Sequence, residues 1–246
     1  MWFLKKKEET QMSIDWDRHW DIEEKMMFGT SKTKNEEFDK NGYLIVRNMW
    51  DPKDLQEEIV YNRGSSLMYN VHGKAIEGEE TQVSGSTARH SYPPYKFYHA
   101  QFRRKMEKII GDELFNTYHY DRVYYSGQEL VRHMDRPVCE ISLTFQIGTN
   151  CKEPWPIWIK TPDTFDENGN IIKKGKDVPI NLSDGDAVIY KGCERPHWRE
   201  PLKSRYSVIQ RGIRKLLRKK DDTYHHQAFF HYVLADGQRC SVSGKG

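Results

Sequence analysis

The sequence predicts a mostly β fold with buttressing helices, of the double-stranded β-helix (jelly-roll, cupin-like) barrel type. Helix-like segments come first, and from residue 120 onward most segments have the patterns of strands. Aromatic residues make up 13% of the chain, which argues for an ordered core although only 37% of residues are hydrophobic. Helices followed by a run of strands fit a barrel in which helices cover one sheet.

The length of 246 residues suits a single domain. We expect a charged, partly ordered leader at 1–36, one barrel domain at 37–236, and a flexible tail at 237–246. A basic insertion is expected within the domain, near 208–222. The net charge of +3 is modest and excludes no class of partner.

The first half of the domain carries the expected helices. Asp51–Leu55 is a turn into a helix, with proline at an early position. Residues 64–95 are rich in Gly, Ser and Tyr without periodicity, which indicates a long loop of the kind that is often functional. Phe97–Ile110 has apolar residues at helical spacing with basic residues between them, so it predicts an amphipathic helix.

The second half is read as strands joined by turns. An aromatic run, Val123–Tyr125, is followed by a Ser-Gly turn and predicts two strands that meet at a bend. Glu140–Ile147 alternates polar and apolar residues, the pattern of a half-buried strand. The other expected elements are a hairpin at Asn168-Gly169, a turn at Asp184-Gly185 with a short apolar strand after it, and a strong strand at Gln227–Val233.

His133-Met134-Asp135, followed by His197, is the main candidate for chemistry. Two histidines and one carboxylate on one face of a small site are a ligand set for non-haem iron(II). On an extended chain His133 and Asp135 point to the same face, because they are two residues apart. His197 follows a buried strand and a loop, where it can face the mouth of a barrel. We therefore predict that these three residues form a metal site.

A His-x-acid triplet is expected by chance in a chain with 10 His and 36 Asp plus Glu. A second one occurs at His19-Trp20-Asp21. Acidic residues surround it and no strand pattern lies beside it, so we interpret it as part of a solvated helix or loop. Context therefore favours His133 and Asp135.

The chain resembles the iron(II)/2-oxoglutarate-dependent dioxygenases, most closely the prolyl-hydroxylase-like and phytanoyl-type branch. The resemblance is strongest from Tyr125-Ser126-Gly127 to His133-Met134-Asp135-Arg136-Pro137. Pro196-His197 followed by Ser204–Ser207 is similar to the second-histidine segment of the family. Phe38–Val46 looks like the opening strand of the phytanoyl-type members.

The resemblance implies that His133, Asp135 and His197 hold Fe(II) and that 2-oxoglutarate chelates the iron. Arg205 would then pair with the distant carboxylate of 2-oxoglutarate, since a guanidinium fork matches a carboxylate. Further contacts to the co-substrate would come from Ser207, Tyr125 and Thr144. The implied reaction is hydroxylation of a C–H bond of a protein side chain or small molecule by dioxygen, with release of succinate and CO2.

One departure from the family pattern leaves open which residue pairs with the distant carboxylate of 2-oxoglutarate. Arg205 follows His197 by a slightly shorter interval than is usual in the family. If Gln227–Val233 is the core strand after His197, residues 203–224 are an insertion and Arg205 lies outside the site. Gln227 or His225 would then occupy the anchoring region. Arg199 either orients His197, touches the substrate or forms a surface salt bridge.

The insertion carries a basic run that predicts contact with an acidic partner, nucleic acid or phosphate-bearing ligand. Leu216 and Leu217 make an amphipathic helix plausible there, and a solvated charged insertion is the alternative. The basic residues are Arg211, Arg214, Lys215, Arg218, Lys219 and Lys220.

The cysteines point to a reducing compartment. Cys139, Cys151, Cys193 and Cys240 show no metal-binding spacing, so free thiols are expected. No stretch approaches the length of a membrane span, and the N-terminus lacks a signal-peptide pattern. These observations predict a cytoplasmic protein without a membrane partner.

Three competing interpretations remain. The first keeps the barrel and the iron but drops 2-oxoglutarate, as in cupin-type oxygenases, and it gains weight if Arg205 is exposed. The second is a non-catalytic jelly-roll binding protein, against which the intact His133, Asp135 and His197 set argues. The third is a nucleic-acid-binding module that depends on the basic run alone.

Overall fold

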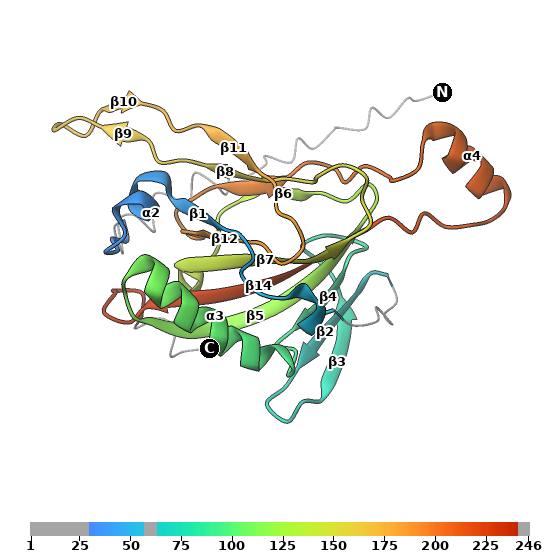
Figure 1. Cartoon of the computed structure of the whole chain (residues 1–246), viewed down its shortest axis with the longest axis horizontal. Helices are drawn as coiled ribbons and strands as arrows, with labels where there is room; N and C mark the ends of the chain where they lie inside the picture. The colour runs from blue at the N-terminus through green and yellow to red at the C-terminus, as the bar shows by residue number, and fades with distance from the viewer. Residues whose placement is uncertain (1–29, 57–62, 241–246) are drawn as a thin grey trace, which may run out of the picture.

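The computed structural model describes residues 30–56 and 63–240, and it contains two main sheets and three helices (Figure 1). The larger sheet has the order β1 (Tyr43–Val46), β12 (Ala187–Tyr190), β7 (Ile141–Thr149), β14 (Tyr224–Leu234), β5 (Leu114–Tyr125), β4 (Thr87–His90), β2 (Ser65–Tyr69), β3 (Ala75–Glu79). The smaller sheet has the order β11 (Asp177–Ile180), β8 (Ile157–Lys160), β13 (His197–Arg199), β6 (Leu130–His133). The remaining elements are the hairpin β9 (Thr164–Phe165) and β10 (Ile171–Lys173), helices α2 (Glu36–Asn41), α3 (Tyr95–Ile110) and α4 (Val208–Leu216), and the 3-10 helices η1 (Pro52–Asp54) and η2 (Pro137–Cys139).

From β5 onward the chain passes back and forth between the two sheets. Strands β5, β7, β12 and β14 belong to the larger sheet, and β6, β8, β11 and β13 belong to the smaller one. The two sheets face each other and enclose the interior of a barrel (Figure 1). The predicted jelly-roll barrel with buttressing helices is therefore confirmed.

Helix α3 covers the outer face of the larger sheet. Its buried residues recur three or four positions apart, the spacing that places them on one face of a helix. The ring of Phe102 packs against the rings of Phe145 in β7 and Phe230 in β14, with centroids 5.2 and 4.9 Å apart. The helix ends at Gly111, which adopts the left-handed conformation at φ 83°. The amphipathic helix predicted at Phe97–Ile110 is confirmed.

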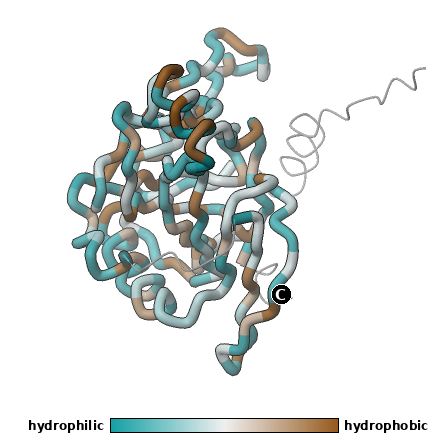
Figure 2. Tube along the Cα trace, turned by 90° about the vertical axis from the view of Figure 1, so that its right-hand side faces the viewer, coloured by the Kyte–Doolittle hydropathy of each residue, from teal (hydrophilic) through white to brown (hydrophobic). Residues whose placement is uncertain are grey.

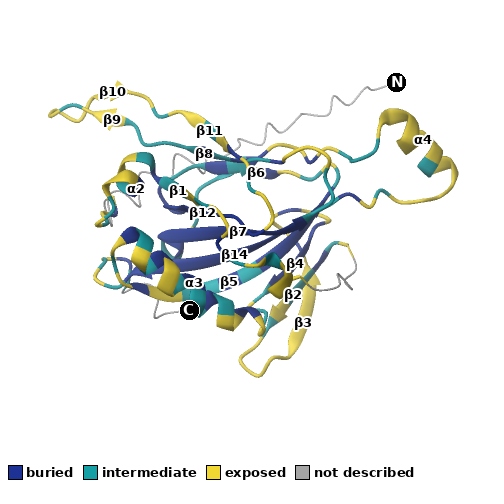
Figure 3. Cartoon of the chain, in the orientation of Figure 1, coloured by how far each residue is buried: buried dark blue, intermediate teal, exposed yellow. Residues whose placement is uncertain are grey.

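Strand β7 alternates as predicted, but both of its faces are buried (Figure 3). The apolar residues Ile141, Leu143 and Phe145 belong to the core under α3. The polar residues between them, Ser142 and Thr144, face the inside of the barrel, where they contact other polar side chains. The prediction of a half-buried strand was wrong because the second sheet covers the face that the sequence assigned to solvent. The polar residues of this alternating pattern thus line the buried interior of the barrel.

Two local expectations need correction. Residues 64–95, predicted as a long loop, contain β2, β3 and β4, which extend the larger sheet beyond β5. Strand β3 is exposed along its whole length, so it has no alternating pattern from which the sequence would reveal it. The first part of the expected opening strand, Phe38–Val46, is helix α2, and β1 begins only after the left-handed Gly42.

The ends of the described chain pack on the barrel. Arg239 is 2% exposed and forms ion pairs with Glu140 at 3.2 Å and Glu194 at 3.8 Å. Residues 237–240 are thus anchored, and the prediction of a flexible tail was wrong for them, because two buried carboxylates attract this guanidinium. Ser31, at the end of the predicted leader, also bonds to Glu140 and Glu194. Residues 1–29, which include His19-Trp20-Asp21, lie outside the described residues.

All four cysteines are free, as predicted from their spacing. Within residues 30–56 and 63–240, no helix is both long and apolar enough to cross a membrane.

We predict that Phe102→Ala lowers the free energy of unfolding by about 3–5 kcal/mol, because it removes a fully buried ring from the contact between α3 and the sheet. Phe97→Ala on the same helix is the matched control. Its ring is 59% exposed, so a change below about 0.5 kcal/mol is expected. Urea denaturation measures both. Equal losses in the two variants would contradict the assigned face of α3.

Candidate metal centre

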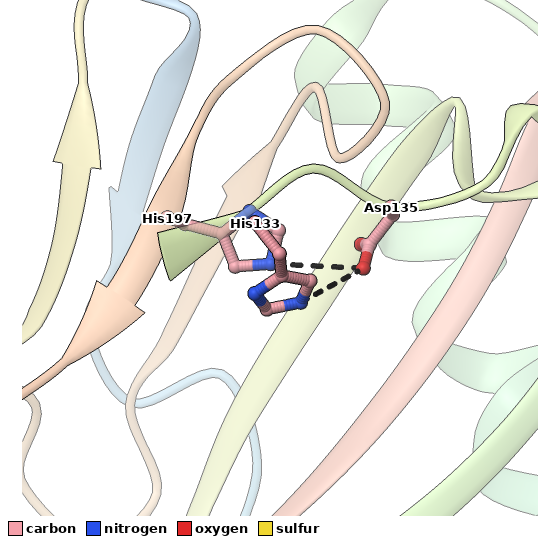
Figure 4. Close-up of side chains that lie close together, drawn as sticks. All are labelled: His133, Asp135 and His197. Atoms are coloured by element: carbon pink, nitrogen blue, oxygen red, sulfur yellow. Dashed lines mark ion pairs between the residues drawn. The ribbon is translucent and has the colours of Figure 1, made fainter. Parts of the chain in front are cut away.

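The smaller sheet brings the two histidines together. Strands β6 and β13 are antiparallel, and His133, the last residue of β6, lies directly opposite His197, the first residue of β13. Asp135 follows β6 by two residues, and its backbone N–H donates to the carbonyl of Gly192 at 3.0 Å. The three side chains point toward one another (Figure 4).

The ligand atoms of the three residues are close enough to share one ion. Nε2 of His133 lies 3.5 Å from Oδ1 of Asp135, and Nε2 of His197 lies 3.6 Å from the same oxygen. All three ligand atoms lie within 4.8 Å of one another. The structure thus brings together the three side chains that the sequence singled out.

Both imidazoles are held in the orientation that a metal ligand requires. Nδ1 of His133 donates to the carbonyl of Val131 at 2.8 Å, and Nδ1 of His197 donates to the carbonyl of Arg195 at 2.9 Å. With the proton on Nδ1, the lone pair is on Nε2, which faces Asp135 in each ring. Such backbone acceptors fix the tautomer and the ring angle of metal-binding histidines. The donor set therefore fits a divalent metal with nitrogen and oxygen ligands.

The carboxylate of Asp135 is held by the barrel wall. Oγ of Ser142 in β7 donates to Oδ2 of Asp135 at 3.1 Å. Nδ1 of His231 in β14 lies 2.9 Å from the same Oγ, to which it donates. Oδ1 stays directed at the two histidines while Oδ2 is occupied. Side chains of the larger sheet thus orient Asp135, which lies just after strand β6 of the smaller sheet.

The charges of the three residues suit metal binding at neutral pH. Burial alone would raise the pKa of Asp135, but the neighbouring His197 and His133 outweigh it and hold that pKa well below its usual range. Burial, together with the charge of His133, lowers the pKa of His197 to about 4. Burial also acts to lower the pKa of His133, but the hydrogen bond and charge of Asp135 raise it overall. An ionised carboxylate and a neutral His197 are ready ligands.

Gly192 lets the backbone approach the site. A Cβ at this position would lie 2.3 Å from Oγ of Ser142 and 2.6 Å from Oδ2 of Asp135. No real Cβ tolerates such distances, so any side chain would displace the carboxylate or the serine that holds it. The requirement for glycine here comes from space and not from backbone conformation.

A guanidinium lies deeper in the barrel on the strand that carries His197. Arg199 is two residues further along β13 and 2% exposed. It donates through Nη1 to the carbonyl of Trp155 and through Nη2 to Oε1 of Gln227 at 2.9 Å. Its Nε has no partner, and no carboxylate among the described residues forms an ion pair with it. The surface salt bridge considered for Arg199 is therefore wrong.

This buried cation lacks a counter-charge. Burial lowers the pKa of Arg199 to about 10, so the side chain is still protonated at neutral pH. Burying a charge without an opposite charge is costly, and an anion beside the guanidinium would offset this cost. Tyr190 lies near both Arg199 and His197. The ring of Tyr190 contacts His197 with centroids 4.8 Å apart, and its hydroxyl lies 3.4 Å from Oγ1 of Thr144.

Three of the predicted co-substrate contacts lie elsewhere. Arg205 faces Asp222, with Nε 4.0 Å from its Oδ1, and Ser207 is the exposed N-cap of α4. The hydroxyl of Tyr125 bonds to Thr87 at 3.2 Å. The structure brings none of these three into contact with the triad, whereas Thr144 does face the barrel interior.

Each displacement has a physical cause. The strand after β13 is β14, so Arg205 and Ser207 belong to an excursion outside the barrel, as the alternative interpretation of residues 203–224 anticipated. Along β5, side chains alternate between faces, and the inward position is Tyr124, which packs with Trp155 and Phe229. Tyr125 therefore lies on the opposite face of β5 from Tyr124. The sequence offered Arg199 as a residue that could orient His197 or touch the substrate, but no pattern around it indicated that its side chain is buried.

Solved structures with the same fold include enzymes of one chemical family. The α-ketoglutarate-dependent epimerase SnoN of nogalamycin biosynthesis is 11% identical, with 80% of each chain covered and a TM-score of 0.53. The carbocyclase SnoK of the same biosynthesis is 13% identical, covering 89% of this chain and 94% of that one at a TM-score of 0.52. HygX from Streptomyces hygroscopicus, with nickel, 2-oxoglutarate and hygromycin B bound, is 8% identical, covering 81% and 86% at 0.50.

No protein-family model and no curated protein sequence matches the chain. At these identities the solved structures establish the fold. The fold implied by the resemblance to iron(II)/2-oxoglutarate-dependent dioxygenases is therefore confirmed.

We predict that Gly192→Ala weakens the binding of a divalent metal by about 10- to 100-fold, because the new methyl group displaces Asp135 or Ser142. Gly212→Ala in α4 is the control, since a Cβ there meets nothing within 4 Å. Calorimetric titration with Co²⁺ measures both affinities. Unchanged Co²⁺ affinity in Gly192→Ala would show that the carboxylate of Asp135 is not a ligand.

Proposed function

We propose that this chain is an iron(II)/2-oxoglutarate-dependent oxygenase that uses dioxygen, most simply to hydroxylate a C–H bond of a protein side chain or small molecule with release of succinate and CO2. The observation that carries the proposal is the convergence of His133, Asp135 and His197 at the mouth of a jelly-roll barrel, with both Nε2 atoms directed at one carboxylate oxygen. Two histidines and one carboxylate leave coordination positions open for 2-oxoglutarate and dioxygen. The proteins of similar fold carry out epimerisation and ring closure as well, so hydroxylation is the simplest member of a wider set of outcomes.

Arg199 is the residue that we propose for the distant carboxylate of 2-oxoglutarate, in place of Arg205. It is buried, protonated and without a carboxylate partner, and it shares a strand with His197. Gln227 bonds both Arg199 and Gln146, which keeps the guanidinium in place. Thr144 and Tyr190 line the path between Arg199 and the triad.

The protein's own contribution is positioning and exclusion of water. When bound, iron(II) supplies the redox chemistry that activates dioxygen, which side chains do not provide. Backbone carbonyls accept from Nδ1 of His133 and of His197, which directs the Nε2 atom of each ring toward the proposed metal. Asp135 supplies the negative charge, and Ser142 prevents it from turning away. The enclosed, largely buried interior keeps bulk water from the reacting centre.

A second candidate is a cupin-type iron oxygenase that does not use 2-oxoglutarate. Its support is the position of Arg205, which faces Asp222 outside the barrel. In this case Arg199 would receive the anionic group of the substrate itself. The two candidates share the metal site and differ in what occupies the pocket at Arg199.

Two further parts of the proposal concern the surroundings. The six basic residues at 211–220 are proposed to meet an acidic partner, and they lie on or just after α4, apart from the triad (Figure 1). A cytoplasmic location is proposed because the four cysteines are free.

We predict that anaerobic addition of Fe(II) and then 2-oxoglutarate gives a visible charge-transfer band in the wild-type protein and none in His133→Ala, because the variant lacks one ligand. Ultraviolet–visible titration measures the band. His72→Ala is a suitable control, since His72 lies in the exposed turn between β2 and β3. Iron binding without a band in the wild type would favour the second candidate, and absence of iron binding would reject both.

We predict that Arg199→Met raises the Kd of the iron-loaded protein for 2-oxoglutarate by about 10- to 100-fold, since a charge-assisted contact to the carboxylate is lost. Arg205→Met should leave this Kd unchanged. Anaerobic titration followed by the same band gives both values, and thermal unfolding shows whether each variant is folded. A loss confined to Arg205→Met would restore Arg205 as the anchor.

A further inference from the structure

Helix α4 projects from the barrel within the connection between β13 and β14. None of its residues is buried, and it stands clear of both sheets (Figure 1, Figure 3). Figure 2 views the molecule from the side on which α4 projects, with alternating hydrophobic and hydrophilic stretches nearest the viewer. The helix is therefore available to a partner outside this chain.

The helix is formed and held in place before any partner binds. Ser207 and Gln210 make a complete capping box at its N-terminus. Below it, the hydroxyl of Tyr206 donates to Asp222 at 2.7 Å, and Arg214 lies 3.5 Å from the other carboxylate oxygen of Asp222. These contacts join both arms of the excursion. A partner would meet an ordered helix and would not have to fold it.

Apolar and basic side chains lie on opposite sides of α4. The apolar residues are spaced 1, 3 and 4 positions apart, which places them along one face. They are strongly exposed: Val208 75%, Ile209 76%, Ile213 53%, Leu216 84% and Leu217 59%. Arg211, Arg214 and Lys215 occupy the other face, and three more basic residues follow at 218–220. No acidic residue occurs between 208 and 220.

This combination restricts the partner. Nucleic acid or a purely acidic surface would satisfy the basic residues but would leave five aliphatic side chains in water. A groove in another protein would cover the apolar face but would not require every charge on the opposite face to be positive. A surface that is anionic in its outer layer and apolar just beneath it satisfies both faces at once.

We infer that α4 is a peripheral membrane anchor that inserts its apolar face into the interfacial region of an anionic lipid bilayer. Its basic side chains would lie at the level of the phosphate groups, and its axis would lie in the plane of the membrane. The contact is peripheral, since no helix among residues 30–56 and 63–240 is able to span a bilayer. The inference does not depend on the metal centre, and it revises the expectation that the protein has no membrane partner.

The test is flotation of the purified full-length chain with lipid vesicles. We expect binding to phosphatidylcholine vesicles that contain phosphatidylglycerol, weaker binding as the salt concentration rises, and little binding to pure phosphatidylcholine. The double variant Ile209→Ser with Leu216→Ser should lower the partition coefficient at least about tenfold. The double variant Lys215→Glu with Lys219→Glu should also lower the partition coefficient, because it replaces two positive charges with negative ones.

The hairpin of β9 and β10 provides the matched control. Ile171 and Ile172 are 50% and 65% exposed and are followed by two lysines, so Ile171→Ser with Ile172→Ser removes similar apolar surface elsewhere. This control should bind vesicles as the wild type does. Because α4 has no buried residue, its variants should keep the wild-type thermal midpoint.

Three results would overturn the inference. The first is failure of the wild type to bind anionic vesicles, and the second is equal loss of binding in the hairpin control and the α4 variants. The third is binding that survives both α4 double variants. Binding of the wild type to RNA or to an acidic peptide, with none to vesicles, would assign the basic run to a different partner.

Discussion

The antiparallel pairing of β6 with β13 is the constraint on which the site depends. It sets His133 opposite His197, and therefore two histidines that are 64 positions apart in the chain meet at one sheet position. Asp135 completes the set because the chain continues two residues beyond β6 and is held by Ser142 and by the carbonyl of Gly192. The register fixes the site: a shift of one residue in this pairing would send one histidine to the outer face of the sheet.

The closed barrel gives polar residues an unusual role. In an open sheet, Ser142, Thr144 and Gln146 would face water. Their alternation with apolar residues would then indicate only a strand with one solvated face. Here the smaller sheet covers them, so they line a buried polar interior together with Arg199 and Gln227. A protonated guanidinium in such a place is costly without an opposite charge. This cost is the physical basis for proposing that Arg199 binds the distant carboxylate of 2-oxoglutarate.

The excursion between β13 and β14 keeps helix α4 apart from the residues inside the barrel. Inside the barrel, β13 carries both His197 and Arg199, so this short strand holds one of the three proposed metal ligands and the proposed partner of the carboxylate. Outside the barrel, the chain is free to build α4 without disturbing the core, because the ends of the excursion are joined by Asp222 and Thr223 to its first residues. A helix with no buried residue contributes nothing to the barrel, and no other part of the described chain covers its apolar face.

The sequence by itself determined the fold class and the face of α3, and it singled out the three side chains that the structure brings together, because these depend on local periodicity and on residue types that few other sites require. It also exposed the doubtful position of Arg205 through the strand pattern at Gln227–Val233. Only the tertiary structure decided that Tyr124 and not Tyr125 faces inward, that β2, β3 and β4 extend the sheet, and that Arg199 is buried without a counter-charge. Burial is a property of what packs against a residue, and no local pattern states which distant strand will cover it.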